Sequence, residues 1–250
     1  MLLCLQDLKG YTVQATDGEI GAVADFYFDD LQWNLRYAII EVGQWLAPRK
    51  VLITPAVFDR LPNHSHKTFS VSISREQVRI SPDIDTNLPI TRRHEFDLHN
   101  HYGWNPDWFG TIPIGIPYPD FYLPKNVSDP NIEPEISFDP HLYSAKTVKG
   151  YSVQTSDEFA GHVTDFIAEI ESWKIRYLVV DNGKWLPSRK CIVASSWIKS
   201  VSAEEEYVNA DVPLKTIHSS LPFSHYATVT REYEQALYSH YNRKGYWEAC

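Results

Sequence analysis

One segment of this chain occurs twice, and the duplication constrains the fold more than any other feature of the sequence. Residues 9–50 read KGYTVQATDGEIGAVADFYFDDLQWNLRYAIIEVGQWLAPRK, and residues 149–190 read KGYSVQTSDEFAGHVTDFIAEIESWKIRYLVVDNGKWLPSRK. The offset is a constant 140, and 18 of the 42 paired positions are identical. Solenoid repeats recur about every 20 to 50 residues, a period much shorter than 140 residues. The sequence therefore predicts two copies of one domain.

The length of 250 residues is enough for two domains of ordinary size. We place the first domain at residues 1–104 and the second at residues 144–250, each ending in a helix. The intervening residues 105–143 hold 8 of the 16 prolines and several aromatic side chains. Prolines are typical of a linker, whereas disordered linkers are poor in aromatics. We therefore expect an ordered strap that packs its aromatic side chains on the two domains.

Short strands dominate the first copy. β-branched and aromatic residues, alternating with polar ones, predict strands at residues 12–15, 20–29, 35–42, 50–54 and 69–73. The alternation slips once near Gly21, which predicts a bulge or a sharp bend. Strands spaced by roughly 8 to 15 residues favour a small β-barrel over a parallel sheet. The predicted fold class is mainly β, with two small barrels.

One peripheral helix closes each half. Residues 91–102 and 230–241 align at an offset of 139, and they begin at Thr91 and Thr230, a residue type that caps helix N-termini. Residues 74–77 read SREQ, the pattern of a capping box, so we expect a single turn of helix there. Duplication of a self-associating unit puts both partners in one chain. We therefore expect a pseudo-twofold axis between the halves, and self-association is a possible property of the chain.

Charge and cysteine content narrow the class of partner. A formal net charge of −9 argues against nucleic acid and against an anionic membrane surface, since basic faces bind both. No apolar stretch approaches the ~18 residues of a transmembrane segment, and the N-terminus lacks the pattern of a signal peptide. Peripheral membrane association stays open. The three cysteines show no paired spacing, which favours reduced thiols and a cytoplasmic location.

No residue pattern in this sequence indicates catalysis, a metal site or a cofactor. His94 and His101 on the first predicted helix lie two turns apart, roughly 10 Å, which is too far to share a metal ion. Motifs of the GxSxG and phosphate-loop types are absent from the sequence. We therefore expect a protein that is not an enzyme and that has no cofactor.

Two pairs of equivalent carboxylates are candidates for acid–base chemistry. They are Asp17 with Asp157 and Asp25 with Asp165. The members of each pair belong to different repeats, and each has a local structural role available in a turn or at a strand end. We expect that role, with Arg36 and Arg176 as ion-pair partners inside each barrel.

Two equivalent loops carry the candidates for partner binding. The candidate residues are Trp45, Arg49, Lys50, Trp185, Arg189 and Lys190. An aromatic side chain beside basic ones on a hairpin loop is typical of a docking hot spot. The competing interpretation is that each Trp covers the end of its own barrel while the charges face solvent. Substituting the first Trp by Ala distinguishes the two, because only docking predicts weaker binding at an unchanged melting temperature.

The order of these features resembles a known family. Lys9-Gly10, the Asp17-Gly18 turn, Gly21-x-Val23-x-Asp25 and the Arg36-Tyr37 strand are similar to the PRC-barrel domain over much of each half. The second copy departs at the first turn, where Asp157-Glu158 replaces Asp17-Gly18. That family is named for the cytoplasmic domain of the photosynthetic reaction centre H subunit, and it includes the C-terminal domain of the ribosome maturation factor RimM.

The resemblance implies a small β-barrel that serves as an adaptor or regulatory surface without shared catalytic residues. Neither specific role can be carried over, because the H subunit has a membrane helix before its barrel and the RNA-processing partners of RimM belong to a different domain. We expect a non-enzymatic adaptor or regulatory protein that binds another protein. The alternative is a sensor of a small ligand or a metal, with its site between the two repeats.

Overall fold

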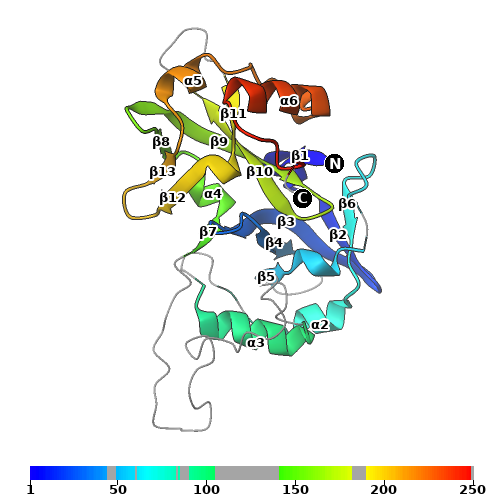
Figure 1. The fold of residues 1–250 in the computed structure, drawn as a ribbon. Helices are drawn as coiled ribbons and strands as arrows, with labels where there is room; N and C mark the ends of the chain where they lie inside the picture. The colour runs from blue at the N-terminus through cyan, green and yellow to red at the C-terminus, as the bar shows by residue number, and fades with distance from the viewer. Residues whose placement is uncertain are drawn as a thin grey trace, which may run out of the picture.

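The structure is a computed structural model that describes residues 1–43, 49–59, 61–82, 84, 90–104, 141–181 and 190–248, with the side chains of residues 92, 93 and 96 left aside. Within these ranges the fold is mainly β and forms two sheets, one for each copy of the repeat. The first half lies in the lower part of Figure 1 and the second half in the upper part. The predicted fold class is confirmed.

The two halves contain corresponding elements in the same order, apart from β12 and η4, which have no counterpart among the described elements of the first half. The first half has β1 (Leu2–Cys4), α1 (Leu5–Leu8), β2 (Thr12–Ala15), β3 (Gly18–Asp29), β4 (Leu35–Val42), β5 (Lys50–Ile53), η1 (Pro55–Val57), β6 (Thr68–Ser70), α2 (Arg75–Arg79) and α3 (Arg92–Tyr102). The second half has β7 (Leu142–Ser144), α4 (Ala145–Val148), β8 (Ser152–Gln154), β9 (Phe159–Glu169), β10 (Lys174–Asp181), β11 (Lys190–Ala194), η3 (Ser195–Trp197), β12 (Ile198–Ser202), β13 (Tyr207–Ala210), α5 (Leu214–His218), η4 (Tyr226–Thr228) and α6 (Arg231–His240).

The predicted strands of the first copy are found with small shifts. β2 and β4 have the predicted bounds, β3 begins two residues earlier, and β5 ends one residue earlier. β6 is shorter than expected, because beyond it the pairing continues only as an isolated bridge between Phe58 and Val71. β1 and β7 were not predicted from the sequence, and β7 begins at Leu142, inside the segment assigned to the strap.

The two sheets have the same strand order, except that the second sheet carries an additional edge strand, β12. In the first half the order is β5-β4-β3-β2-β6, and in the second it is β11-β10-β9-β8-β13-β12. Neighbouring strands are antiparallel except for the pairs β2–β6 and β8–β13, which are parallel. The long strands β3 and β9 each carry one further strand on the edge that β2 or β8 leaves free.

Those further strands are exchanged between the halves. β1 of the first half pairs antiparallel with β9, with Leu2 opposite Glu169. β7 of the second half pairs antiparallel with β3, with Leu142 opposite Asp29. Leu142 is the repeat equivalent of Leu2, and Glu169 is the equivalent of Asp29, so the exchange is reciprocal and keeps one register. Figure 1 shows β1 among the strands of the second half and β7 beside β3.

The pseudo-twofold axis passes between Asn34 and Lys174, which are repeat equivalents and form an isolated antiparallel bridge with each other. Two backbone hydrogen bonds of 2.7 Å flank the bridge, one to the carbonyl of Trp33 and one to that of Trp173. Both Trp residues have a left-handed backbone, with φ of 62° and 49°. A residue that bridges to its own equivalent must lie at a symmetry axis, so the predicted relation between the halves is confirmed.

A bend near Gly21 lets β3 reach both of its edge partners. The pairing of β2 with β3 shifts register between Val13 and Gln14, which leaves Ile20 as the extra residue. A Cβ added to Gly21 would lie 2.0 Å from the backbone oxygen of Glu41 on the neighbouring strand. Only glycine allows this close approach of two backbones. The predicted bulge is confirmed, and the contact with β4 explains why the residue beside it is glycine.

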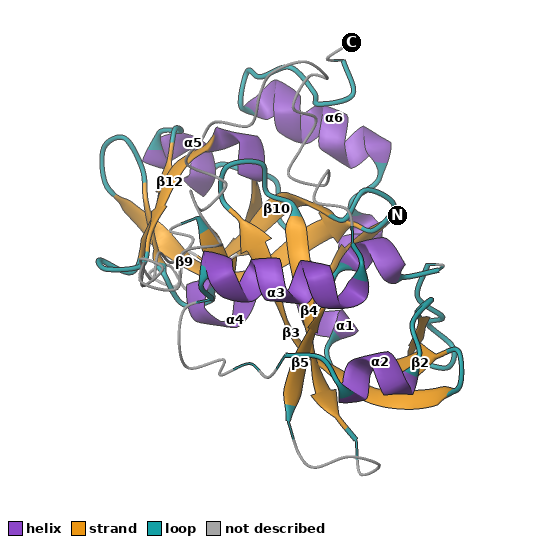
Figure 2. Ribbon diagram, turned by 90° about the horizontal axis from the view of Figure 1, so that it is seen from below, coloured by secondary structure: helices purple, strands orange, loops and turns teal. Residues whose placement is uncertain are grey.

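The predicted helices begin where their capping residues indicated. Thr91 accepts a hydrogen bond from the backbone of His94, and Thr230 accepts one from Tyr233. Ser74 and its partner three residues on form the predicted capping box of α2. α3 and α6 lie at opposite ends of the molecule in Figure 1, and α3 crosses the face of the first sheet in Figure 2. Each helix therefore covers one sheet from outside.

Candidate functional site

The predicted partner-binding residues lie at the two equivalent hairpins β4–β5 and β10–β11. Trp45, Trp185 and Arg189 lie outside the described residues. The other three candidates are described, and the structure assigns them different contacts.

Arg49 contacts the end of a helix. Its Nη2 atom donates to the carbonyl oxygens of Val78 and Ser81, both at 2.9 Å, and to the Ser81 hydroxyl at 2.6 Å. Val78 lies in the last turn of α2 and Ser81 follows its end, where a positive charge complements the helix dipole. Arg49 therefore has a structural role in holding α2 against the hairpin, and its use by a partner stays a prediction.

Lys50 and Lys190 begin the second strand of each hairpin. Lys50 stands opposite Glu41 and Lys190 stands opposite Asp181, so each lysine has an acidic residue as its cross-strand neighbour. Opposite charges facing each other across two strands favour the pairing slightly. Lys190 is exposed, whereas Lys50 is half-buried. Their use by a partner stays a prediction.

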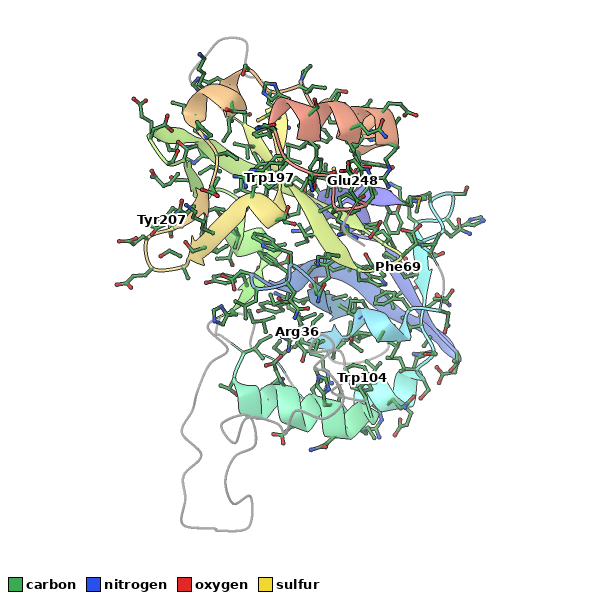
Figure 3. The ribbon with its side chains drawn as sticks, in the orientation of Figure 1. Arg36, Phe69, Trp104, Trp197, Tyr207 and Glu248 are labelled. Carbon is green, nitrogen blue, oxygen red and sulfur yellow. The ribbon has the colours of Figure 1, made fainter. Side chains whose placement is uncertain are left out.

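A buried polar cluster lies under α3 in the first half (Figure 3). Glu95 of the helix accepts from Nη2 of Arg36 at 2.9 Å and from the hydroxyl of Tyr37 at 3.0 Å. The Tyr37 oxygen also lies 3.2 Å from Nε2 of His99. Burial lowers the pKa of His99 to about 4, and the neighbouring Arg36 charge adds to this effect. The imidazole is therefore neutral near pH 7.

The second half keeps the carboxylate and the tyrosine but changes the cation. Glu234 of α6 accepts from the hydroxyl of Tyr177 at 2.6 Å and from Tyr246 at 3.0 Å. Arg231 lies 2.9 Å from the same carboxylate. Burial and the hydrogen bond to Glu234 raise the pKa of Tyr177 above its usual range. In both halves the cluster fixes a helix to its sheet.

Sequence reasoning missed the role of these clusters. Glu95 and Glu234 are identical residues at the helix offset, and Tyr37 and Tyr177 are identical residues at the strand offset. The sequence therefore showed that both copies have the same glutamate on the helix and the same tyrosine on the strand. The sequence does not say that the helix packs on that strand, so the pair could not be identified before the fold was known.

The expected ion pairs of Arg36 and Arg176 with the aspartates are wrong. Arg36 bonds Glu95 instead, and Nη2 of Arg176 lies 2.6 Å from Glu169. Asp25 caps α4 of the other half, and its cationic partner within the first half is Lys9, at 3.3 Å. The sequence assigned these aspartates to their own barrels because nothing in the local pattern indicates the exchanged strands.

Asp25 and Asp165 cap helices across the boundary between the halves. Asp25 accepts from the hydroxyl of Ser144 at 2.5 Å and from the backbone of Lys146 at 3.1 Å, at the start of α4. Asp165 accepts from the backbone of Gln6 at 3.3 Å, at the start of α1. A carboxylate at this position satisfies free backbone N–H groups and the positive end of the helix.

Further polar residues within each half also hold helices. Asp17 accepts from the backbone of Arg75 at 2.8 Å at the start of α2, and Asp157 accepts from Leu214 at 2.9 Å at the start of α5. His101 of α3 donates to a carbonyl of α2 at 2.7 Å. The structural role expected for the paired carboxylates agrees with these contacts. Across the described ranges, no group of three or more His, Cys, Asp or Glu side chains could hold a metal ion.

Aromatic side chains fill the space beside the pseudo-twofold axis. The ring centroids of Phe28 and Phe166, one from each half, lie 5.2 Å apart, and Phe28 also stacks on Trp33 at 5.3 Å. Trp173 packs on Phe58 of the other half at 5.1 Å. The sensor alternative puts its ligand site between the repeats, where these rings and the backbone bridge lie. That alternative stays a prediction.

Comparison with known proteins adds a family relation. A family model of the PRC-barrel domain matches residues 5–64 and residues 140–216, which together make up more than half of the chain. A search of the curated proteins finds no match. In the part of the chain that the structure describes, no helix combines the length and the apolar character that crossing a membrane requires.

Proposed function

Because the chain belongs to the PRC-barrel domain family, with one match in each half, we propose that it is a non-enzymatic adaptor or regulatory protein that binds another protein. The observation that carries this proposal is the use made of the buried charged groups. Glu95, Glu234 and Asp25 each bind a neighbouring structural element, so their charges hold helices in place. A catalytic carboxylate instead needs access to a substrate.

The proposed binding surface is the pair of hairpins that carry the six candidate residues. Lys190 is exposed at the base of its hairpin. The repeat makes the two hairpins equivalent, so each hairpin offers a partner a similar contact. We place the binding in the cytoplasm, since Cys4 is a buried free thiol of the kind that a reducing compartment maintains.

The test is affinity capture from the native source with four versions of the full chain as bait. They are the wild type, Trp185→Ala, Lys190→Glu and the control Lys215→Glu, which makes the same charge change on the exposed surface of α5. We expect the wild type and the control to retain one set of proteins that the two hairpin variants lose. Melting temperatures of all four are compared, because unchanged stability separates lost contact from lost folding.

Two results would contradict the proposal at different levels. Equal capture by all four baits would move the binding surface away from the hairpins while leaving the adaptor function intact. Absence of any protein retained above a bait-free control, under conditions where the bait is folded, would refute the adaptor function itself.

A further inference from the structure

The contact between the two halves has the form of a reciprocal docking site. Each half donates a three-residue strand followed by one turn of helix, β1–α1 or β7–α4, to the other half. One more backbone hydrogen bond extends each strand pair. Ile170 donates to the carbonyl of Met1 at 3.0 Å, and Asp30 donates to that of His141 at 3.1 Å. These two bonds are repeat equivalents, so both docking sites have the same geometry.

The acceptor half recognises more than a strand edge. Asp25 is only 5% exposed, and its carboxylate receives both the hydroxyl of Ser144 and the backbone of Lys146. The equivalent Asp165 receives the backbone of Gln6. Separating the halves removes these hydrogen bonds from a buried carboxylate. Asp25 keeps its ion pair with Lys9 of its own half, at 3.3 Å, but it loses the donors at the start of α4, and a buried polar group that loses its donors costs free energy. The halves therefore hold each other by specific polar contacts.

Apolar contacts accompany the polar ones. Leu5 and Leu8 of α1 are 1% and 0% exposed, and α1 packs against β9 of the other half. Phe28 and Phe166 meet across the boundary, as described above. Permanent protein–protein interfaces are likewise more apolar than transient ones and resemble a domain core. The boundary between the halves therefore resembles the interface of an obligate dimer.

We propose that this boundary is a homotypic binding interface whose partner is a second copy of a half. The two halves remain bound to each other when the covalent connection through residues 105–140 is cut. Two copies of the chain can therefore exchange halves. The first half of one copy then pairs with the second half of another through the contacts seen within one chain. Such an exchange closes on itself and needs no new contact surface. This inference does not depend on the proposed adaptor function.

The connecting segment determines the protein concentration at which exchange between copies can be detected. Residues 105–140 join the halves covalently, and a covalent connection between two binding partners can raise their effective concentration to the order of millimolar. Pairing within one chain therefore prevails at micromolar protein concentration. Once the tether is cut, the halves of different copies compete on equal terms.

The experiment cuts the full chain after it has folded. A recognition sequence for a specific protease is inserted after residue 120, and the folded chain is cleaved and passed over a size-exclusion column at micromolar concentration. We expect the two fragments to elute together at the volume of the uncut chain. Elution as separate fragments would overturn the proposal.

Exchange is then measured with two cleaved copies, one of which carries an affinity tag on its first half. Equal amounts are mixed in urea, refolded by dialysis and captured through the tag. By mass action, about half of the captured second halves should come from the untagged copy. Capture of none, or failure of the cleaved mixture to refold where the uncut chain refolds, would show that the halves do not recognise each other in trans.

A matched pair of cap variants tests the contact itself. Asp25→Ala removes a cap between the halves, whereas Asp17→Ala removes a cap of the same kind within the first half. We expect Asp25→Ala to speed dissociation of the folded, cleaved halves about tenfold, which corresponds to the usual effect of one helix cap. Asp17→Ala should leave that rate unchanged. Equal rates for both variants would contradict the assignment of Asp25 to the interface.

Discussion

The buried contact between Arg36 and Glu95 allows a sharp test of how α3 is held. Both residues are 5% exposed, and the carboxylate also accepts from Tyr37. Glu95→Ala leaves the guanidinium buried without its counter-charge. Breaking a buried ion pair by removing one partner costs about 3–5 kcal/mol. We expect a loss of this size in the free energy of unfolding of the first half.

A double variant separates the contact from simple loss of packing. In Arg36→Met combined with Glu95→Leu, apolar side chains replace both charges. Because burying an ion pair costs nearly as much as the pair gains, apolar replacement of both partners is often neutral. The double variant should therefore recover most of the stability that Glu95→Ala loses. Glu76→Ala breaks an exposed pair with Arg79 and serves as the control, with little expected effect.

The assay is urea unfolding, followed by circular dichroism for the helices and by tryptophan fluorescence for the cores. The slopes of the transitions should agree among the variants, because only then do the midpoints report changes in stability. A loss below about 1 kcal/mol for Glu95→Ala would refute the reasoning. So would a double variant that is no more stable than the single one.

Three further predictions concern pH, backbone approach and the hairpin. Because the folded His99 has a pKa of about 4, below its usual 6.5, its contribution to stability should be complete above pH 6.5 and should fall as the pH drops toward 4. The free energy of unfolding should decrease by about 2 kcal/mol at pH 5, and this decrease should be absent from His99→Gln. Equal shifts of the urea midpoint in the two proteins would contradict this prediction. Gly21→Ala should lower the free energy of unfolding by about 3 kcal/mol, because the added methyl group clashes with Glu41. Gly10→Ala, whose Cβ meets no atom within 4 Å, should lower it by only about 1 kcal/mol. Similar losses in urea unfolding would argue against the close approach of the two backbones. Arg49→Ala should lower the free energy of unfolding by about 1–2 kcal/mol, because α2 loses its C-terminal partner. An unchanged melting temperature would contradict the structural role of Arg49.

Local patterns determined much of this molecule. Strands such as Thr12–Ala15 and Leu35–Val42 follow from the side chains they contain, and the helices begin at Thr91 and Thr230 because a hydroxyl there satisfies free backbone groups. The repeat itself established two related domains and a symmetric relation between them. Each of these features depends on residues that are close in sequence or identical between the copies, so the chain could be interpreted without coordinates.

The partners of the buried charges depended on tertiary structure. Asp25 and Arg36 both belong to the repeated segment, and an ion pair between them was a reasonable expectation. In the fold, Asp25 instead contacts α4, where Lys146 lies 121 positions away in the sequence. Arg36 contacts Glu95 of α3. The candidate hairpins were chosen from composition alone, and the structure adds that Arg49 also serves α2.

The exchange of β1 and β7 is the clearest case of information that the sequence alone did not supply. A strand of three residues has too few positions for a pattern, and its stability comes from hydrogen bonds to a partner strand. Either half could offer that partner edge, since β3 and β9 are equivalent. The sequence therefore determined that there are two copies of one module. Packing in three dimensions decided that each copy is completed by the other.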